Sequence, residues 1–123
     1  MKLRIKGNSI RLRLLRGETA ELGTIGKVSE TVNFGSRQFV YTLTATNAAD
    51  GISASFTENE IIVNLPNLLA RDWVESSNVS LEAEQKISET ETLKILIEKD
   101  FVCLDRPDDA DNQDAFPHPS KKC

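Results

Sequence analysis

The chain has 123 residues, of which 39% are hydrophobic and 28% charged, a composition typical of one soluble globular domain. No apolar run approaches the roughly 20 residues of a membrane helix, and the first residues alternate charged and apolar side chains instead of forming a signal peptide. We therefore expect a cytoplasmic protein with reduced thiols and no membrane contact.

The formal net charge of −4 is distributed unevenly. Residues 1–16 carry six Lys and Arg and no acid, whereas residues 17–104 and 105–123 are both acidic. Summed charge governs encounter and binding more than it governs fold. The basic start of the chain therefore predicts a surface for nucleic acid or for an acidic partner.

Alternation of apolar and polar side chains predicts strands over residues 2–6 and 10–14, with the apolar residues on one face and Lys and Arg on the other. Further strands are predicted over residues 28–34, 39–45, 52–56, 61–65, 79–83 and 93–97. Two short helices are predicted over residues 16–23 and 67–74, with Gly23 as a left-handed cap and Pro66 in a first helical turn. The fold class is α+β, mostly β.

A shift of 51 residues aligns the two halves of the chain, and each half predicts the order ββαββ. One inserted residue keeps the last hairpin in phase, so that Leu43 aligns with Ile95. We expect a duplication, with repeats over residues 1–46 and 52–99 of a single domain over residues 1–104. The alternative is that any two short ββαββ stretches align this way. Identical pairs at the shift of 51 are Asn8/Asn59, Ile10/Ile61, Leu14/Leu65, Val28/Val79 and Ser29/Ser80.

The second half has a strand ending at Pro66, a short amphipathic helix and a hairpin, and it resembles the swapped-hairpin domain of AbrB- and MazE-type proteins. In the first half, Gly7, Asn8, Ser9 and Arg13 correspond to the loop and following Arg of MazE-type antitoxins. The resemblance implies a small β-barrel-like domain with pseudo-two-fold symmetry, in which units exchange hairpins and bind DNA. Over its whole length the chain also resembles a family of small bacterial proteins of unassigned function.

This resemblance implies that Arg4, Asn8, Ser9 and Arg13 contact DNA, and charge and alternation add Lys6 and Arg11. Phosphate contacts would supply most of the affinity and make it salt-dependent. The corresponding positions of the second half carry no positive charge, so we expect DNA on one side only. These positions are Ser55, Thr57, Glu58, Asn59, Glu60, Ile62 and Asn64.

Two other interpretations of the basic strands stay open. Strands with one face in water commonly carry Lys and Arg there, and acids elsewhere in the sheet would then neutralise them. The same face would also suit a protein partner or a second copy of the chain. The acids considered for neutralisation are Glu82, Glu84, Glu89, Glu91 and Glu98.

Residues 105–123 hold three prolines and five acids, which predicts an irregular tail. Phe116 is expected to anchor this tail on the domain, or alternatively to be recognised by another protein. Phe101, Val102 and Leu104 are expected to continue the last strand or to cover one end of the core. Cys103, His118 and Cys123 are candidate metal ligands. They are weak candidates, because their spacing matches no usual zinc pattern. We expect neither metal nor cofactor.

The sequence lacks a Gly-x-Ser-x-Gly motif, a phosphate-binding glycine loop and a zinc-protease His pair, so we expect no enzymatic activity. The predicted function is a protein-interaction or structural module, present as a monomer or homodimer with an unknown protein partner. The alternative is an AbrB/MazE-like DNA-binding regulator or antitoxin that uses the basic N-terminal strands.

Overall fold

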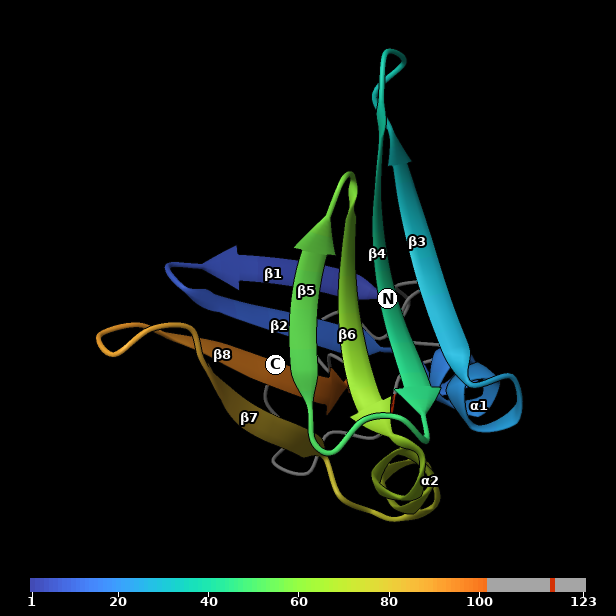
Figure 1. Ribbon diagram of the computed structural model, residues 1–123. Coiled ribbons are helices and arrows are strands. Elements are labelled where there is room, and N and C mark those ends of the chain that lie inside the picture. The colour runs from blue at the N-terminus through green and yellow to red at the C-terminus, as the bar shows by residue number, and fades with distance from the viewer. Residues whose placement is uncertain (102–115, 117–123) are drawn as a thin grey trace.

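Eight strands and two helices build the part of the chain that the computed structural model describes, residues 1–101 and 116 (Figure 1). Every predicted strand and helix is present, and no predicted bound is wrong by more than three residues. The elements are β1 (Lys2–Lys6), β2 (Ser9–Leu14), α1 (Arg16–Thr24), β3 (Lys27–Asn33), β4 (Gln38–Thr46), β5 (Ser53–Thr57), β6 (Glu60–Pro66), α2 (Asn67–Glu75), β7 (Ser80–Lys86) and β8 (Thr92–Lys99). Predictions for Val102, Cys103, Leu104, His118, Cys123 and, apart from Phe116, the tail over residues 105–123 lie outside the described residues.

The strands form two four-stranded sheets, and each sheet takes one hairpin from each half of the chain. Sheet A has the order β1-β2-β8-β7, and sheet B has the order β3-β4-β6-β5. The central pairs β2–β8 and β4–β6 are parallel, whereas the hairpin pairs are antiparallel. The two halves therefore exchange hairpins within one chain, and neither half contains a complete sheet.

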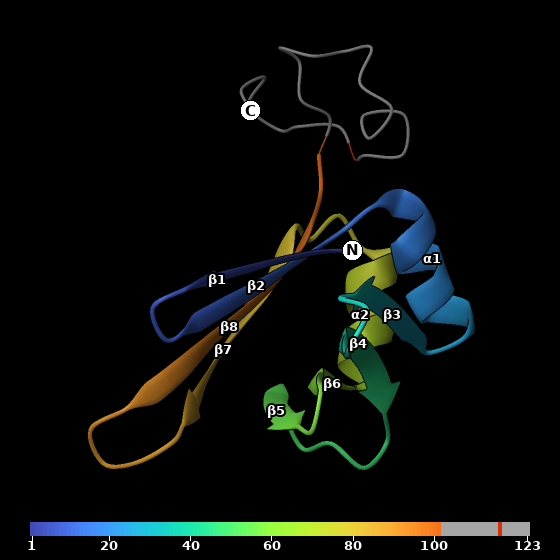
Figure 2. The same cartoon turned by 90° about the horizontal axis from the view of Figure 1, so that it is seen from above.

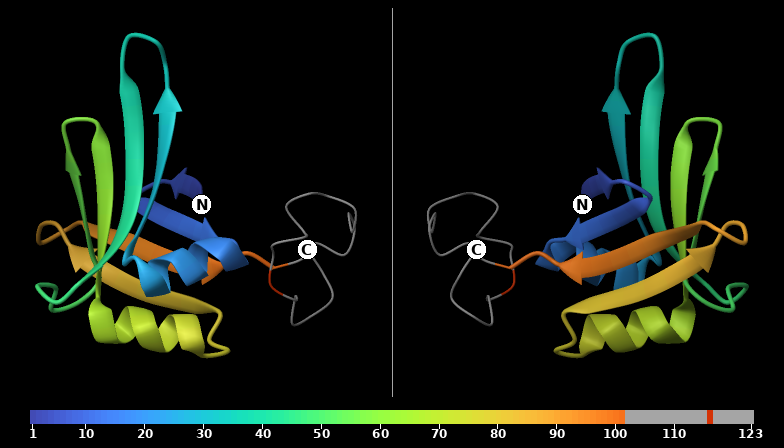
Figure 3. Two further views of the ribbon diagram at one scale, coloured as in Figure 1. Left: turned by 90° about the vertical axis from the view of Figure 1, so that its right-hand side faces the viewer. Right: turned by 90° about the vertical axis from the view of Figure 1, so that its left-hand side faces the viewer.

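The strands of sheet A run across those of sheet B, and both helices lie at the same end of the molecule (Figures 1–3). The sheets do not close into a barrel, so the predicted barrel-like closure is wrong. Side chains, not backbone ladders, join the sheet edges: Gln85 on β7 bonds the backbone N–H and C=O of Ala54 on β5 at 2.6 and 3.0 Å. Next to the other edge strand of sheet A, the hydroxyl of Tyr41 on the inner strand β4 donates to the carbonyl of Met1 at 2.7 Å.

The 51-residue repeat holds for the first three elements of each half, because β1, β2 and α1 shift onto β5, β6 and α2. The predicted phase of the last hairpin is wrong. Leu12 pairs with Ile97 in sheet A, and its equivalent Val63 pairs with Leu43 in sheet B, so Leu43 corresponds to Ile97 and not to Ile95. Relative to the first half, the second half has two additional residues before β7 and a third within the β7–β8 hairpin. The first two make Val28 equivalent to Leu81 and not to Val79.

Two predicted helix boundaries also need correction. Helix α1 continues past Gly23 to Thr24, and the left-handed residue behind it is Gly26, with φ +88°. The N–H of Gly26 bonds the carbonyl of Leu22 at 3.0 Å. Gly23 instead lies against α2, since a Cβ there would meet Val74 at 3.2 Å. Pro66 is the residue before α2 and does not lie in its first turn.

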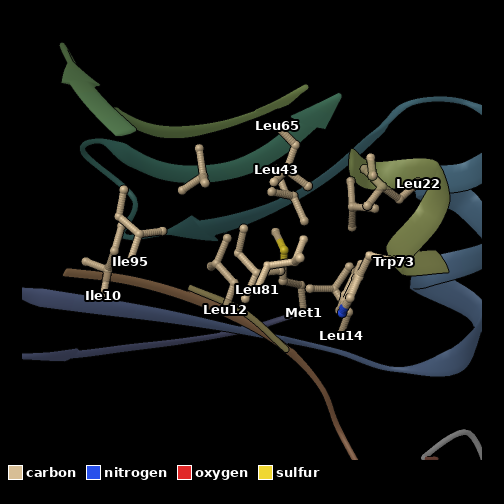
Figure 4. Close-up of a cluster of buried hydrophobic side chains, with 14 residues drawn as sticks. Met1, Ile10, Leu12, Leu14, Leu22, Leu43, Leu65, Trp73, Leu81 and Ile95 are labelled. Carbon is tan, nitrogen blue, oxygen red and sulfur yellow. The ribbon is translucent and has the colours of Figure 1, made fainter. Parts of the chain in front are cut away.

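The hydrophobic core lies between the two sheets and beneath the helices (Figure 4). Alternate residues of the central strands are fully buried, so the predicted apolar face of residues 10–14 is confirmed. Burying one such side chain stabilises the fold by about 1.5–3 kcal/mol. The largest fully buried side chains are Trp73, Leu12, Leu14, Leu22, Leu43, Leu65, Ile95, Ile97 and Val63.

Candidate functional site

The basic residues at the start of the chain lie on the outer face of sheet A, away from the core. In the β1–β2 hairpin, Lys2 is opposite Arg13 and Arg4 is opposite Arg11, while Lys6 is opposite Ser9. Like charges directly opposite each other destabilise an antiparallel pair. We call Lys2, Arg4, Lys6, Arg11 and Arg13 the basic surface.

One carboxylate of β8 neutralises part of this surface. Arg13 donates from Nε to Glu98 Oε1 at 2.5 Å, and the Nε of Arg11 lies 3.6 Å from the same oxygen. Arg4 and Lys6 are exposed, and neither makes an ion pair with any residue that the structure describes. Lys2 is paired with Asp100 at 3.1 Å, so the positive charge of β1 that lacks an ion pair with a described residue is that of Arg4 and Lys6.

The charge of the outer face changes sign across sheet A. Arg11 on β2 is opposite Leu96 on β8, and Leu96 is opposite Glu82 on β7, with Glu84 further along the same strand. A hollow of about 530 Å³ lies over this boundary, lined in part by Arg11, Leu96 and both glutamates. The basic surface is therefore bordered by carboxylates on the same face.

Asn8 and Ser9 build the turn between β1 and β2 and attach it to the neighbouring strand. The Asn8 amide donates to the carbonyl of Thr92 at 2.9 Å, and the Ser9 hydroxyl donates to the carbonyl of Lys6 at 2.6 Å. The structure places both residues next to the basic surface, as the sequence predicts. The Ser9 hydroxyl proton and one of the two amide N–H groups of Asn8 are therefore engaged within the protein, and donating either of them to a ligand would require breaking its bond.

The equivalent face of sheet B carries hydroxyl and amide groups in place of cations. The Thr42 hydroxyl lies 2.7 Å from that of Ser29, and it contacts the carboxylate of Glu60 at 2.5 Å. Strands β5 and β6, which correspond to β1 and β2, contain no Lys or Arg. The basic surface therefore occurs on sheet A and has no counterpart on sheet B.

A second cluster surrounds Phe116 near the end of β8. Its ring lies 6.0 Å from the ring of Phe101 and 5.2 Å from the Nζ of Lys99, and its N–H donates to the carbonyl of Asp100 at 2.7 Å. The structure thus places Phe116 on its own domain. Its predicted role in binding a partner stays a prediction.

Sequence analysis missed Lys99 as the centre of this cluster. Its Nζ donates to the carbonyl of Ser76 at 2.7 Å and lies 5.5 Å from the ring of Trp73. Burial lowers the pKa of Lys99 from the ordinary lysine value, because desolvation disfavours the ammonium form. The signal was present in the alternation of β8, where Lys99 follows Ile95 and Ile97 on the inward face.

Neither α1 nor α2 is long and apolar enough to cross a membrane. Within residues 1–101 and 116, no group of three His, Cys, Asp or Glu is placed to hold a metal ion.

The fold and surface define a small α+β domain made of two ββαββ units that exchange hairpins, with a basic surface on one sheet. The chain belongs to a family of unknown function, DUF7009, whose model matches residues 1–120. No curated protein and no solved structure matches the chain. The resemblance to AbrB- and MazE-type domains stays a prediction from the sequence pattern.

Proposed function

We propose that this protein is a non-catalytic interaction module that binds an acidic protein segment through the basic surface. One observation carries the proposal: Arg4 is opposite Arg11 in the outer hairpin, and Arg4 and Lys6 lack an ion pair with any described residue. Such like-charge pairing is unfavourable in an isolated sheet, and an anionic partner would relieve it.

The shape of the basic surface supports an extended partner. Strand β1 is an edge strand of sheet A, so one side of its backbone does not belong to the ladder. An extended segment that pairs along this edge by β-augmentation would place alternate carboxylates beside Arg4 and Lys6. Main-chain hydrogen bonds would then supply affinity, and these two cations would select acidic segments.

Two observations favour a protein over DNA. The basic surface covers two strands about 5 Å apart, and a duplex lying across it would pass Lys94 on β8 and extend over Glu82 and Glu84 on β7. In addition, the Ser9 hydroxyl donates to Lys6 within the turn, and one amide N–H of Asn8 donates to Thr92 on β8. Both would weaken phosphate contacts and base reading on this face.

The test is fluorescence anisotropy of a labelled peptide of alternating Glu and Val, titrated with the protein at low and at near-physiological salt. For the variant Arg4→Glu/Lys6→Glu we expect affinity to fall by at least about tenfold, since two attractive contacts become repulsive. The control variant Lys27→Glu/Arg71→Glu has the same change in net charge on exposed residues of other elements, and should bind like the wild type. Equal losses in both variants would contradict a defined surface.

DNA binding is the second candidate, favoured by the basic first hairpin together with the exchange of hairpins within the chain. A labelled duplex of random sequence is titrated under the same conditions, beside the variant Arg11→Glu/Arg13→Glu. Salt-sensitive duplex binding that this variant loses, without peptide binding by the wild type, would replace the first proposal with the second.

A further inference from the structure

Sheet B exposes large apolar side chains at the end where its hairpins extend beyond sheet A (Figure 1). The β3–β4 hairpin extends beyond the strands of sheet A, so its far end has no sheet across from it (Figures 1 and 3). Phe34 is 69% exposed, Phe56 67% and Val32 41%. We call Val32, Phe34, Phe39 and Phe56 the tip patch.

The tip patch contains a hollow as well as projecting rings. A hollow of about 320 Å³ is lined in part by Phe34, Phe39 and Phe56. Arg37 and Glu58 also line this hollow, and Arg37 is hydrogen-bonded to Asn59. Large exposed aromatic groups beside a hollow are typical of protein interfaces, where Phe anchors fill pockets.

The turn that carries Phe34 is held in place by its own hydrogen bonds. The N–H of Phe34 donates to the carbonyl of Arg37 at 2.9 Å, and the N–H of Gly35 donates to the side-chain oxygen of Asn33 at 2.9 Å. Gly35 has φ +88°, a conformation that suits glycine. The projecting ring is therefore presented on an ordered turn, which reduces the entropy lost on binding.

We propose that the tip patches of two copies of this chain pack against each other around a two-fold axis. An isologous interface brings the same residues of both copies together, so it requires a self-complementary surface. The tip patch meets this requirement, because its hollow is lined by three Phe rings and also by one cation, Arg37, and one anion, Glu58. A two-fold axis can place each Arg37 beside the Glu58 of the second copy.

This inference does not depend on the proposed function. The tip patch belongs to sheet B and the basic surface to sheet A, so the two share no residue. A dimer formed through the tip patch would leave both basic surfaces exposed and would bind a partner with two acidic segments more tightly than a monomer does.

The experiment is sedimentation velocity of the full chain from low micromolar to near-millimolar concentration. We expect the wild type to dimerise reversibly, and the variant Phe34→Asp/Phe56→Asp to weaken self-association by at least about 30-fold, the loss typical of interface anchors. The control Ile25→Asp/Leu68→Asp alters two apolar side chains that are 73% and 79% exposed elsewhere, and should dimerise like the wild type. Circular dichroism confirms that each variant is folded.

The charges of Arg37 and Glu58 provide a second measurement that does not alter the aromatic residues. Arg37→Glu should weaken the dimer, and Arg37→Glu/Glu58→Arg should restore it. A wild type that stays monomeric, equal association of the Phe34→Asp/Phe56→Asp variant, or equal loss in the Ile25→Asp/Leu68→Asp control would each overturn the proposal. So would a wild type that co-sediments with phospholipid vesicles through the tip patch while remaining monomeric in solution.

Discussion

At the scale of single residues, Tyr41 is a partly buried polar group that joins the two sheets. Its hydroxyl donates to the carbonyl of Met1 while its ring packs against the core. Desolvation, with the nearby charges of Glu30 and Glu18, raises the pKa of the Tyr41 phenol above the ordinary value of 10.0. The folded protein therefore favours the neutral phenol.

The raised pKa of Tyr41 can be measured without substitution, because the chain contains one tyrosine. We expect the phenolate absorbance of the folded protein to appear with a midpoint above pH 10.0. In denaturant the midpoint should return to about 10. Coincident titration curves for the folded and the denatured protein would contradict the prediction.

The raised Tyr41 pKa also predicts how stability changes with pH. Because the folded pKa lies above the unfolded value, the stabilisation from this group is complete below pH 10.0 and is lost as pH rises through the folded pKa. The free energy of unfolding of Tyr41→Phe should therefore fall less steeply over that alkaline range than that of the wild type. Parallel curves for the two proteins would contradict this account.

At the scale of secondary-structure elements, helix α1 depends on a hydrogen-bonded cap at its first turn, which Glu18 provides. Glu18 Oε1 accepts the N–H of Leu15 at 2.9 Å, and its second oxygen pairs with the amino group of Met1. The residue thus closes the first turn of α1 and also attaches the start of β1 to the helix.

Replacing Glu18 separates these two contributions. Glu18→Ala should lower the free energy of unfolding by about 1–3 kcal/mol, since both the cap and the ion pair are lost. Glu18→Gln keeps an oxygen that can accept from Leu15, so it should cost less than the alanine variant. Chemical denaturation measures both values, and equal losses would show that the cap contributes nothing.

The end of α1 depends on a left-handed residue at Gly26. Gly26→Ala should destabilise the fold by about 1–2 kcal/mol, because φ of +88° is unfavourable for a side chain. Gly51→Ala is the matched control, since no positive φ occurs there and a Cβ meets nothing within 4 Å. Thermal unfolding should show a lower midpoint for the first variant and an equal or higher one for the second.

At the scale of the whole molecule, the exchange of hairpins makes the two halves interdependent. Each sheet contains strands from both halves, and the parallel pairs β2–β8 and β4–β6 join them. The core lies between the sheets, so disrupting one sheet exposes apolar side chains of the other. We therefore expect the domain to unfold as one unit.

A single core substitution tests this cooperativity. Leu43→Ala in sheet B should destabilise the protein by about 2–5 kcal/mol, and it should shift the denaturation curves of circular dichroism and Trp73 fluorescence together. Trp73 is the only tryptophan and is fully buried, so its emission reports on the core. Separate transitions for the two signals would contradict interdependent halves.

Much of the local structure was determined by the sequence by itself. Alternation along residues 10–14 directs Leu12 and Leu14 inward and Arg11 and Arg13 outward, because side chains on a strand point to opposite faces in turn. The 51-residue shift likewise relates the first two strands and the helix of each half. These features depend on residues that are close together in the sequence, so the sequence pattern is enough to predict them.

The tertiary structure alone decided which segments meet. The sequence pattern does not show that Leu43 and Ile97 are equivalent, that Glu98 lies between Arg11 and Arg13, or that the aromatic end of sheet B is uncovered. Each of these depends on long-range pairing and on where one sheet crosses the other. Register and coverage are set by the packing of the whole core, so they cannot be derived from a local period of two.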